Sequence, residues 1–93
     1  MNDFDQWFRK NLERFGEKFD SHKVILTYAQ ANQKAYVESL SAVESDKPFQ
    51  YLHSSFGKII KKVCVENKYQ ELDSKHRSLD IFGQNSLCVL WAK

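Results

Sequence analysis

The chain has 93 residues, of which 42% are apolar and 14% aromatic, a composition that excludes a disordered protein and supports one folded domain over residues 1–93. Its formal charge of +2, from 14 Lys and Arg against 12 Asp and Glu, is too small to indicate nucleic-acid binding by itself. The N-terminal residues show no signal-peptide pattern, and no apolar run is long enough to span a membrane, so we expect a cytoplasmic protein.

The first predicted helix covers residues 3–19, where six large apolar side chains fall on one arc at helical spacing. They are Phe4, Trp7, Phe8, Leu12, Phe15 and Phe19. Gly16 lies inside this segment and weakens its last turn, so an earlier end of the helix at Gly16 is the alternative.

The second predicted helix, residues 22–44, is apolar around most of its circumference, which is typical of a central helix that several neighbours cover. Asn32 and Ser39 lie seven residues apart within its apolar arc. A buried polar group without a partner costs about 1–3 kcal/mol. We therefore expect these two side chains either to form a hydrogen bond between helices or to line a small polar pocket.

The third predicted helix covers residues 48–66 and begins at Pro48, because proline is tolerated in the first turn of a helix. Its apolar stripe consists of Phe49, Leu52, Phe56, Ile59, Ile60 and Val63. The polar face contains four candidate binding residues, Tyr51, Lys58, Lys61 and Lys62. This face is either an ordinary solvated surface or a basic surface for an anionic protein or for nucleic-acid phosphates.

The C-terminal third has two interpretations. In the first, a helical spacing predicts a fourth helix over residues 69–82, followed by a buried C-terminal segment. The spacing relates Tyr69, Leu72, His76, Leu79 and Phe82. The fold is then mainly α, a compact antiparallel bundle of three to four helices around the central helix. In the second, short runs separated by turn residues form a three-stranded β-meander within residues 68–92, and the fold is α+β.

His76 and Arg77 are of the residue types that perform acid–base chemistry beside a phosphate. On the second interpretation, the basic residues in these short strands resemble the closing meander of RelE-type ribonuclease toxins, which implies a small ribonuclease that uses His76 and Arg77. A lone histidine on an apolar stripe is more often a packed core residue. Cys64 and Cys88 match neither a disulfide framework nor a zinc-binding spacing, so we expect buried free thiols, no metal and no cofactor.

The preferred functional hypothesis is a small non-enzymatic interaction or regulatory protein that binds another protein or itself. Seven Phe, four Tyr and two Trp are many for so small a core, and exposed aromatics concentrate binding energy at interfaces. Trp7 and Trp91 are the candidates for partial exposure. The first alternative is nucleic-acid binding through the lysine face of residues 48–66, and the second is the ribonuclease. We expect no membrane partner.

Overall fold

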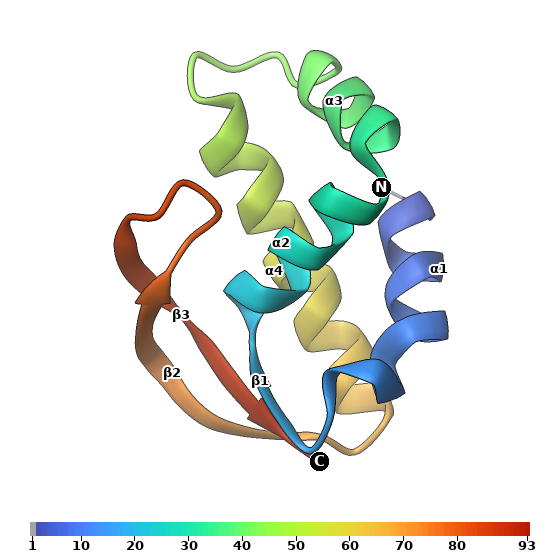
Figure 1. Ribbon diagram of the computed structural model, residues 1–93, viewed down its shortest axis with the longest axis vertical. Coiled ribbons are helices and arrows are strands. Elements are labelled where there is room, and N and C mark those ends of the chain that lie inside the picture. The colour runs from blue at the N-terminus through green and yellow to red at the C-terminus, as the bar shows by residue number, and fades with distance from the viewer. Residues whose placement is uncertain (1) are drawn as a thin grey trace.

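The computed structural model describes residues 2–93, which form helices packed beside a small antiparallel sheet (Figure 1). The elements in chain order are α1 (Asn2–Asn11), a 3-10 turn η1 (Leu12–Phe15), β1 (Lys18–Asp20), α2 (Ser21–Ala31), α3 (Gln33–Ser41), α4 (Pro48–Glu66), β2 (Gln70–Leu79) and β3 (Asn85–Ala92). The strand order is β1-β3-β2, so the last strand along the chain lies at the centre of the sheet. The prediction of a mainly α bundle is therefore wrong, and the α+β alternative has the correct class.

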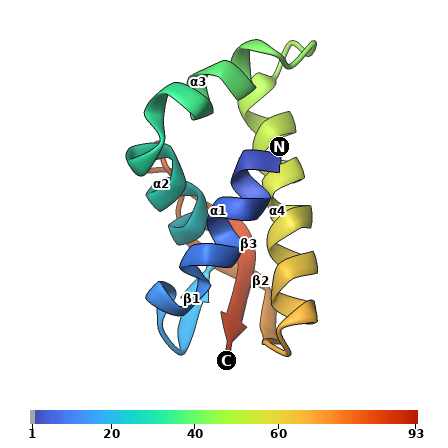
Figure 2. The same ribbon diagram turned by 90° about the vertical axis from the view of Figure 1, so that its right-hand side faces the viewer.

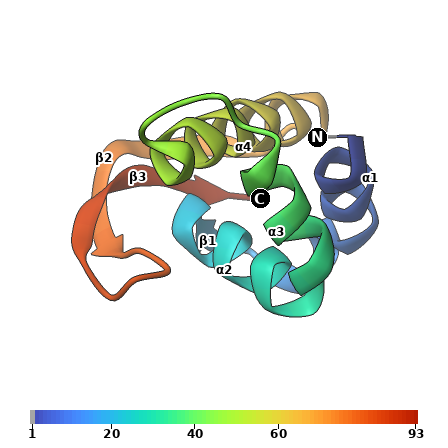
Figure 3. The same ribbon diagram turned by 90° about the horizontal axis from the view of Figure 1, so that it is seen from above.

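The central helix is α4. Its observed range is the predicted one, and four of its apolar side chains are at most 2% exposed, namely Leu52, Phe56, Ile60 and Val63. The other three helices pack against this apolar side (Figures 2 and 3). The ring of Phe56 stacks on Phe4 of α1 with 4.1 Å between centroids and meets Tyr28 of α2 edge-on at 5.5 Å. The central position predicted for residues 22–44 therefore belongs to α4.

The predicted helix over residues 22–44 is broken at Asn32, which separates α2 from α3. The Asn32 side-chain amide donates to the carbonyl oxygen of Tyr28 at 3.2 Å, because a short polar side chain competes with the regular helical hydrogen bonds. The Ser39 hydroxyl donates to the carbonyl oxygen of Ala35 at 2.9 Å. Both hydrogen bonds stay within one helical turn, so the prediction of a bond between helices at Asn32 and Ser39 is wrong.

The first helical segment ends before the predicted boundary. α1 continues into the η1 turn and stops at Gly16, whose φ of 79° lies in the left-handed region that glycine adopts without strain. The chain then turns back as β1, and Phe19 pairs in register with Trp91 of β3. Phe19 is buried as its apolar character demands, but it reaches the core from a strand rather than from the predicted helix.

α4 ends in a Schellman motif that redirects the chain. Lys68 has a left-handed φ of 63°. The backbone amide of Tyr69 donates to the carbonyl oxygen of Cys64 at 2.8 Å, and the backbone amide of Lys68 donates to the carbonyl oxygen of Val65 at 3.1 Å. The chain continues as β2, so the predicted fourth helix over residues 69–82 is wrong.

The β2–β3 hairpin differs from the meander that was the alternative prediction. The register shifts between Glu71 and His76, so one irregular strand replaces the first two strands of that meander. β3 contains the apolar run that was expected to be buried, and it pairs with a strand on each side. Only Trp91 of this strand is buried and Leu87 is 54% exposed, so the prediction of a buried C-terminal segment is wrong for the rest of the run. In residues 2–93, no helix combines the length and the apolar content that crossing a membrane requires.

Candidate functional site

The exposed side of α4 brings the predicted basic residues together. We define the α4 face as the exposed side chains of Gln50, Tyr51, Ser54, Lys58, Lys61 and Lys62. Their spacing of three and four residues places them on one side of the helix, opposite the stripe that packs on α1, α2 and α3. Tyr51 is 59% exposed. The four candidates Tyr51, Lys58, Lys61 and Lys62 therefore form one continuous surface.

The lysines of the α4 face form no ion pairs within residues 2–93, although Asp46 and Asp80 line the same groove as Lys58. The single carboxylate of α4 is Glu66, at its last residue, and this side chain accepts from Arg9 of α1 at 2.7 Å. Because Glu66 is occupied on the α1 side, the three lysines are left as a local positive surface.

A groove of about 1140 Å³ lies between α4 and the β2–β3 hairpin. We call it the α4–hairpin groove. Its α4 wall includes His53, Ser54, Gly57 and Lys58, and its opposite wall includes Leu87 and Val89 of β3. The groove is therefore continuous with the α4 face through Ser54 and Lys58.

Aromatic rings close one end of the α4–hairpin groove. Phe82, in the hairpin turn, packs edge-on against Phe49 with 4.7 Å between centroids and stacks on His53 at 6.1 Å. Phe49 is 42% and Phe82 52% exposed, so these two rings and Tyr51 are the most exposed aromatic side chains within residues 2–93. The sequence did not single out Phe49 or Phe82 as exposed.

His53 lies between the ring of Phe82 and the hydroxyl of Tyr36. Its Nε2 lies 2.6 Å from the hydroxyl of Tyr36. Burial lowers the pKa of His53, although the charge of Asp80 acts in the opposite direction. Burial also raises the pKa of Tyr36 to about 12. The hydrogen bond between Nε2 of His53 and the hydroxyl of Tyr36 fixes the orientation of the imidazole, which makes this contact a positioning element for the aromatic side chains of the groove.

His22, at the start of α2, ties the hairpin to the helices. Its Nδ1 lies 2.8 Å from the hydroxyl of Ser78 and its Nε2 lies 3.2 Å from that of Ser86. Ser78 and Ser86 are register partners on β2 and β3, so one imidazole bridges both strands. His22 and His53 line the same groove although they are 31 positions apart, and no sequence pattern relates them.

The hairpin turn is held by Asp80. Its carboxylate oxygen Oδ1 accepts from the amides of Phe82 at 2.9 Å and Gln84 at 3.0 Å. Burial opposes ionisation of Asp80, but the amide hydrogen bonds from Gln84 and Phe82 outweigh it, and the pKa lies below its ordinary value. The turn that presents Phe82 to α4 is therefore well ordered by its own hydrogen bonds.

The structure separates the two residues of the ribonuclease hypothesis. The imidazole Nε2 of His76 lies 3.4 Å from a carboxylate oxygen of Asp20, and Nη1 of Arg77 lies 3.5 Å from the side-chain oxygen of Asn85. Adjacent residues of a strand point to opposite faces of the sheet, so His76 and Arg77 do not converge. In residues 2–93, there is no cluster of three or more potential metal ligands.

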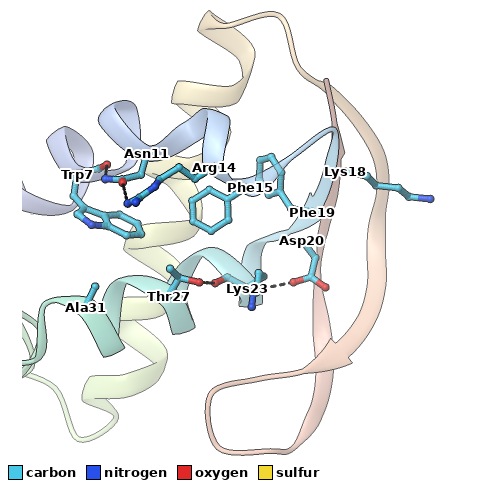
Figure 4. A pocket seen from close by; sticks show the side chains of 10 residues that line it. All are labelled: Trp7, Asn11, Arg14, Phe15, Lys18, Phe19, Asp20, Lys23, Thr27 and Ala31. Carbon is cyan, nitrogen blue, oxygen red and sulfur yellow. Dashed lines mark hydrogen bonds between the residues drawn. The ribbon is translucent and has the colours of Figure 1, made fainter.

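The two tryptophans occupy different environments. Trp91 is 1% exposed and pairs with Phe19 inside the sheet, so the expectation that Trp91 is partly exposed is wrong. Its position in the central strand makes it a core residue. Trp7 is partly buried and lines a second cavity, of about 610 Å³, between α1 and α2 (Figure 4).

The two cysteines also differ in environment. Cys64 is buried in α4, and burial raises the pKa of its thiol to about 12. Cys88 is partly buried in β3, with its sulfur 3.5 Å from the Ser78 hydroxyl. Both are free thiols, as predicted, but only Cys64 is buried, so the prediction of burial is wrong for Cys88.

Comparisons of the chain with known protein families, with curated proteins and with solved structures give no significant match.

Proposed function

We propose that this protein binds nucleic acid through the α4 face. The observation that carries the proposal is the set of three exposed lysines that lack ion-pair partners within residues 2–93. They share one side of a helix whose only carboxylate is held elsewhere by Arg9. A helix face with this charge is suited to phosphate groups, which dominate the affinity of proteins for nucleic acids.

The dimensions and side chains of α4 fit the major groove of a DNA duplex. Its 19 residues make a helix about 28 Å long, and the major groove, about 12 Å wide, admits one α-helix. Gln50, Ser54 and Lys58 follow each other at i+4 along the exposed side. In DNA complexes, glutamine forms hydrogen bonds with adenine, lysine with guanine, and serine with several bases. Lys61 and Lys62, one turn further on, are placed for the phosphates.

The order of elements supports the same assignment. α3 and α4 are consecutive packed helices. The β2–β3 hairpin follows α4 directly, and Phe82 in its turn packs on Phe49 and His53 near the start of α4 (Figure 1). Helix-turn-helix proteins use the second helix of such a pair in the major groove, and a hairpin beside that helix is placed to contact the flanking backbone. The connection here, residues 42–47, is longer than the usual turn of three or four residues, so α3 and α4 depart from that motif, and the α4 face supports nucleic-acid binding more directly than the topology does.

Gly57 gives independent support. A glycine inside a helix costs about 1 kcal/mol relative to alanine, yet a Cβ at Gly57 would meet no atom within 4 Å. No packing contact therefore explains the glycine. It lines the α4–hairpin groove next to Lys58, where the missing side chain lets a nucleic-acid backbone approach the helix closely.

Salt dependence is the first test. Three lysine–phosphate contacts give a slope of about −2.7 in the logarithm of affinity against the logarithm of salt concentration, which is a loss of about 40-fold between 50 and 200 mM salt. Fluorescence anisotropy with a labelled duplex of mixed sequence measures this slope. If the protein does not bind the duplex at low salt, the proposal is wrong.

A pair of double variants separates the α4 face from net charge. Lys61→Gln with Lys62→Gln should reduce the magnitude of the salt slope by about 1.8. The matched control is Lys10→Gln with Lys34→Gln, which removes the same charge from exposed positions on α1 and α3. We expect the control to leave the slope within measurement error. An equal reduction of the salt slope in both double variants would mean that the α4 face is not the surface that contacts the duplex.

A further inference from the structure

The cavity between α1 and α2 lies away from the α4 face. Both helices pack on the apolar side of α4, so their outer surfaces cannot touch a duplex bound to the opposite side of that helix (Figure 3). Its volume of about 610 Å³ falls in the range of sites that bind small molecules or a few side chains. We call it the α1–α2 cavity.

The floor of the α1–α2 cavity is aromatic and rigid. The rings of Trp7 and Phe15 meet edge-on with 6.1 Å between centroids, and Trp7 also packs edge-on against Tyr28 at 5.2 Å. Figure 4 shows both rings facing α2, on the side where Thr27 and Ala31 line the cavity. Trp7 and Phe15 are only partly buried. A held, accessible indole of this kind is typical of an anchor point for a binding partner.

The rim of the α1–α2 cavity is positively charged. Arg14, Lys18 and Lys23 are among its lining residues and are exposed, although the Lys18 side chain points away from the aromatic rings (Figure 4). Arg14 donates to the side-chain oxygen of Asn11 at 2.8 Å, which holds the guanidinium beside Trp7 (Figure 4). In residues 2–93, none of these three cations forms an ion pair.

The single carboxylate that lines the cavity is already engaged. Asp20 accepts from the amide of Lys23 at 2.9 Å, where it caps α2, and its other oxygen lies 3.4 Å from His76. On the neighbouring turn, Glu13 is held by Lys93 at 2.8 Å. The cavity therefore combines an apolar floor with an unbalanced positive rim.

We infer that the α1–α2 cavity binds an acidic segment of a protein partner, with an aromatic side chain of that segment on Trp7 and its carboxylates on Arg14 and Lys23. Charge complementarity selects this occupant, because the positive rim attracts carboxylates and the indole supplies apolar contact for an aromatic ring. The site is concave and small, unlike the extended α4 face. The two surfaces would let one chain hold a protein and a nucleic acid at the same time.

The probe is a capped peptide of sequence Glu-Asp-Phe-Asp-Glu, with Gln-Asn-Phe-Asn-Gln as the neutral control. The readout is the indole N–H signal of Trp7 in NMR spectra, and the buried Trp91 provides an internal reference. We expect a saturable shift of the Trp7 signal with a dissociation constant of about 1 mM or below, and affinity for the neutral peptide about tenfold weaker.

Two variants keep the test specific. Arg14→Gln with Lys23→Gln should reduce the affinity for the acidic peptide about tenfold. The control, Lys10→Gln with Lys34→Gln, removes the same charge outside the cavity and should leave this affinity unchanged. The inference is overturned if the Trp7 signal shows no saturable shift, if both peptides bind with equal affinity, or if both double variants lose the same affinity for the acidic peptide. It is also overturned if a DNA duplex displaces the peptide from Trp7. Each of these outcomes leaves the salt-dependence test of the α4 face unaffected.

Discussion

The replacement of Gly57 by alanine separates a functional glycine from a structural one. Gly57 is the tenth of the 19 residues of a regular helix, and a Cβ there would meet no atom within 4 Å. Alanine exceeds glycine in helix propensity by about 1 kcal/mol. Because nothing opposes the added methyl group, we expect the Gly57→Ala variant to be more stable by about 1 kcal/mol, which raises Tm by about 4–8 °C in a domain of this size.

The matched control is Gly83→Ala. A Cβ at Gly83 would also meet no atom within 4 Å, but Gly83 has a left-handed φ of 76°. The same methyl group should therefore destabilise the protein by about 1–2 kcal/mol. Thermal unfolding followed by circular dichroism measures both changes. The pair tests backbone conformation alone, because the space around the two glycines is equivalent.

The same Gly57 variant tests the role of the α4–hairpin groove. A more stable protein with weaker duplex affinity would support close approach of a nucleic acid at Gly57. If Gly57→Ala lowers Tm, the added methyl group meets a neighbouring side chain, and the claim that no packing contact requires glycine at this position is refuted. If Tm rises and duplex affinity does not change, Gly57 has no part in binding, and the proposal rests on the lysines alone.

Two further predictions concern the histidines. The lowered pKa of His53 means that the unfolded chain binds the proton more readily. The free energy of unfolding should therefore fall as pH drops below about 6.5, by at most about 1.4 kcal/mol per pH unit, and urea titrations of the wild type and of His53→Gln should show a flatter profile for the variant. His22→Ala removes both hydrogen bonds to Ser78 and Ser86, which costs about 1–3 kcal/mol in total. Faster hydrogen exchange of the hairpin amides should reveal the loss, and unchanged protection would show that the bridge does not hold the hairpin.

The range of α4 could be predicted because its sequence contains all the relevant signals. Pro48 starts the helix, and the apolar residues from Leu52 to Val63 repeat at helical period. The polar face followed from the same pattern, since the side opposite a buried stripe faces solvent. The candidates on that face therefore emerged as a group before the fold was known.

The C-terminal third could not be predicted in the same way. β2 is an edge strand with almost every residue exposed, so its sequence lacks the alternation that marks a half-buried strand. The spacing from Tyr69 to Phe82 resembles a helix only by coincidence. β1 has three residues and is a strand because it pairs with β3, some 70 positions later. Long-range pairing of this kind leaves no local pattern.

The candidate site also has parts that the sequence predicts and parts that it does not. The lysines of α4 belong to one helix and could be predicted from its sequence. The α4–hairpin groove, the bridge from His22 and the α1–α2 cavity are formed by segments that are distant along the chain. One local signal for the groove was available, because a glycine inside a strongly periodic helix indicates a position where a side chain is disfavoured. Trp91 was misplaced because an apolar run alone does not tell which residue faces the core.

The central position of β3 determines the order in which the fold can be completed. β1 and β2 do not pair with each other and share β3 as their partner. Until residues 85–92 have been synthesised, both strands present unpaired edges and the space that Trp91 occupies is empty. Unpaired edges promote aggregation, and contacts between distant residues slow folding. A nascent or truncated chain that lacks β3 is therefore the form of this protein most in need of a chaperone.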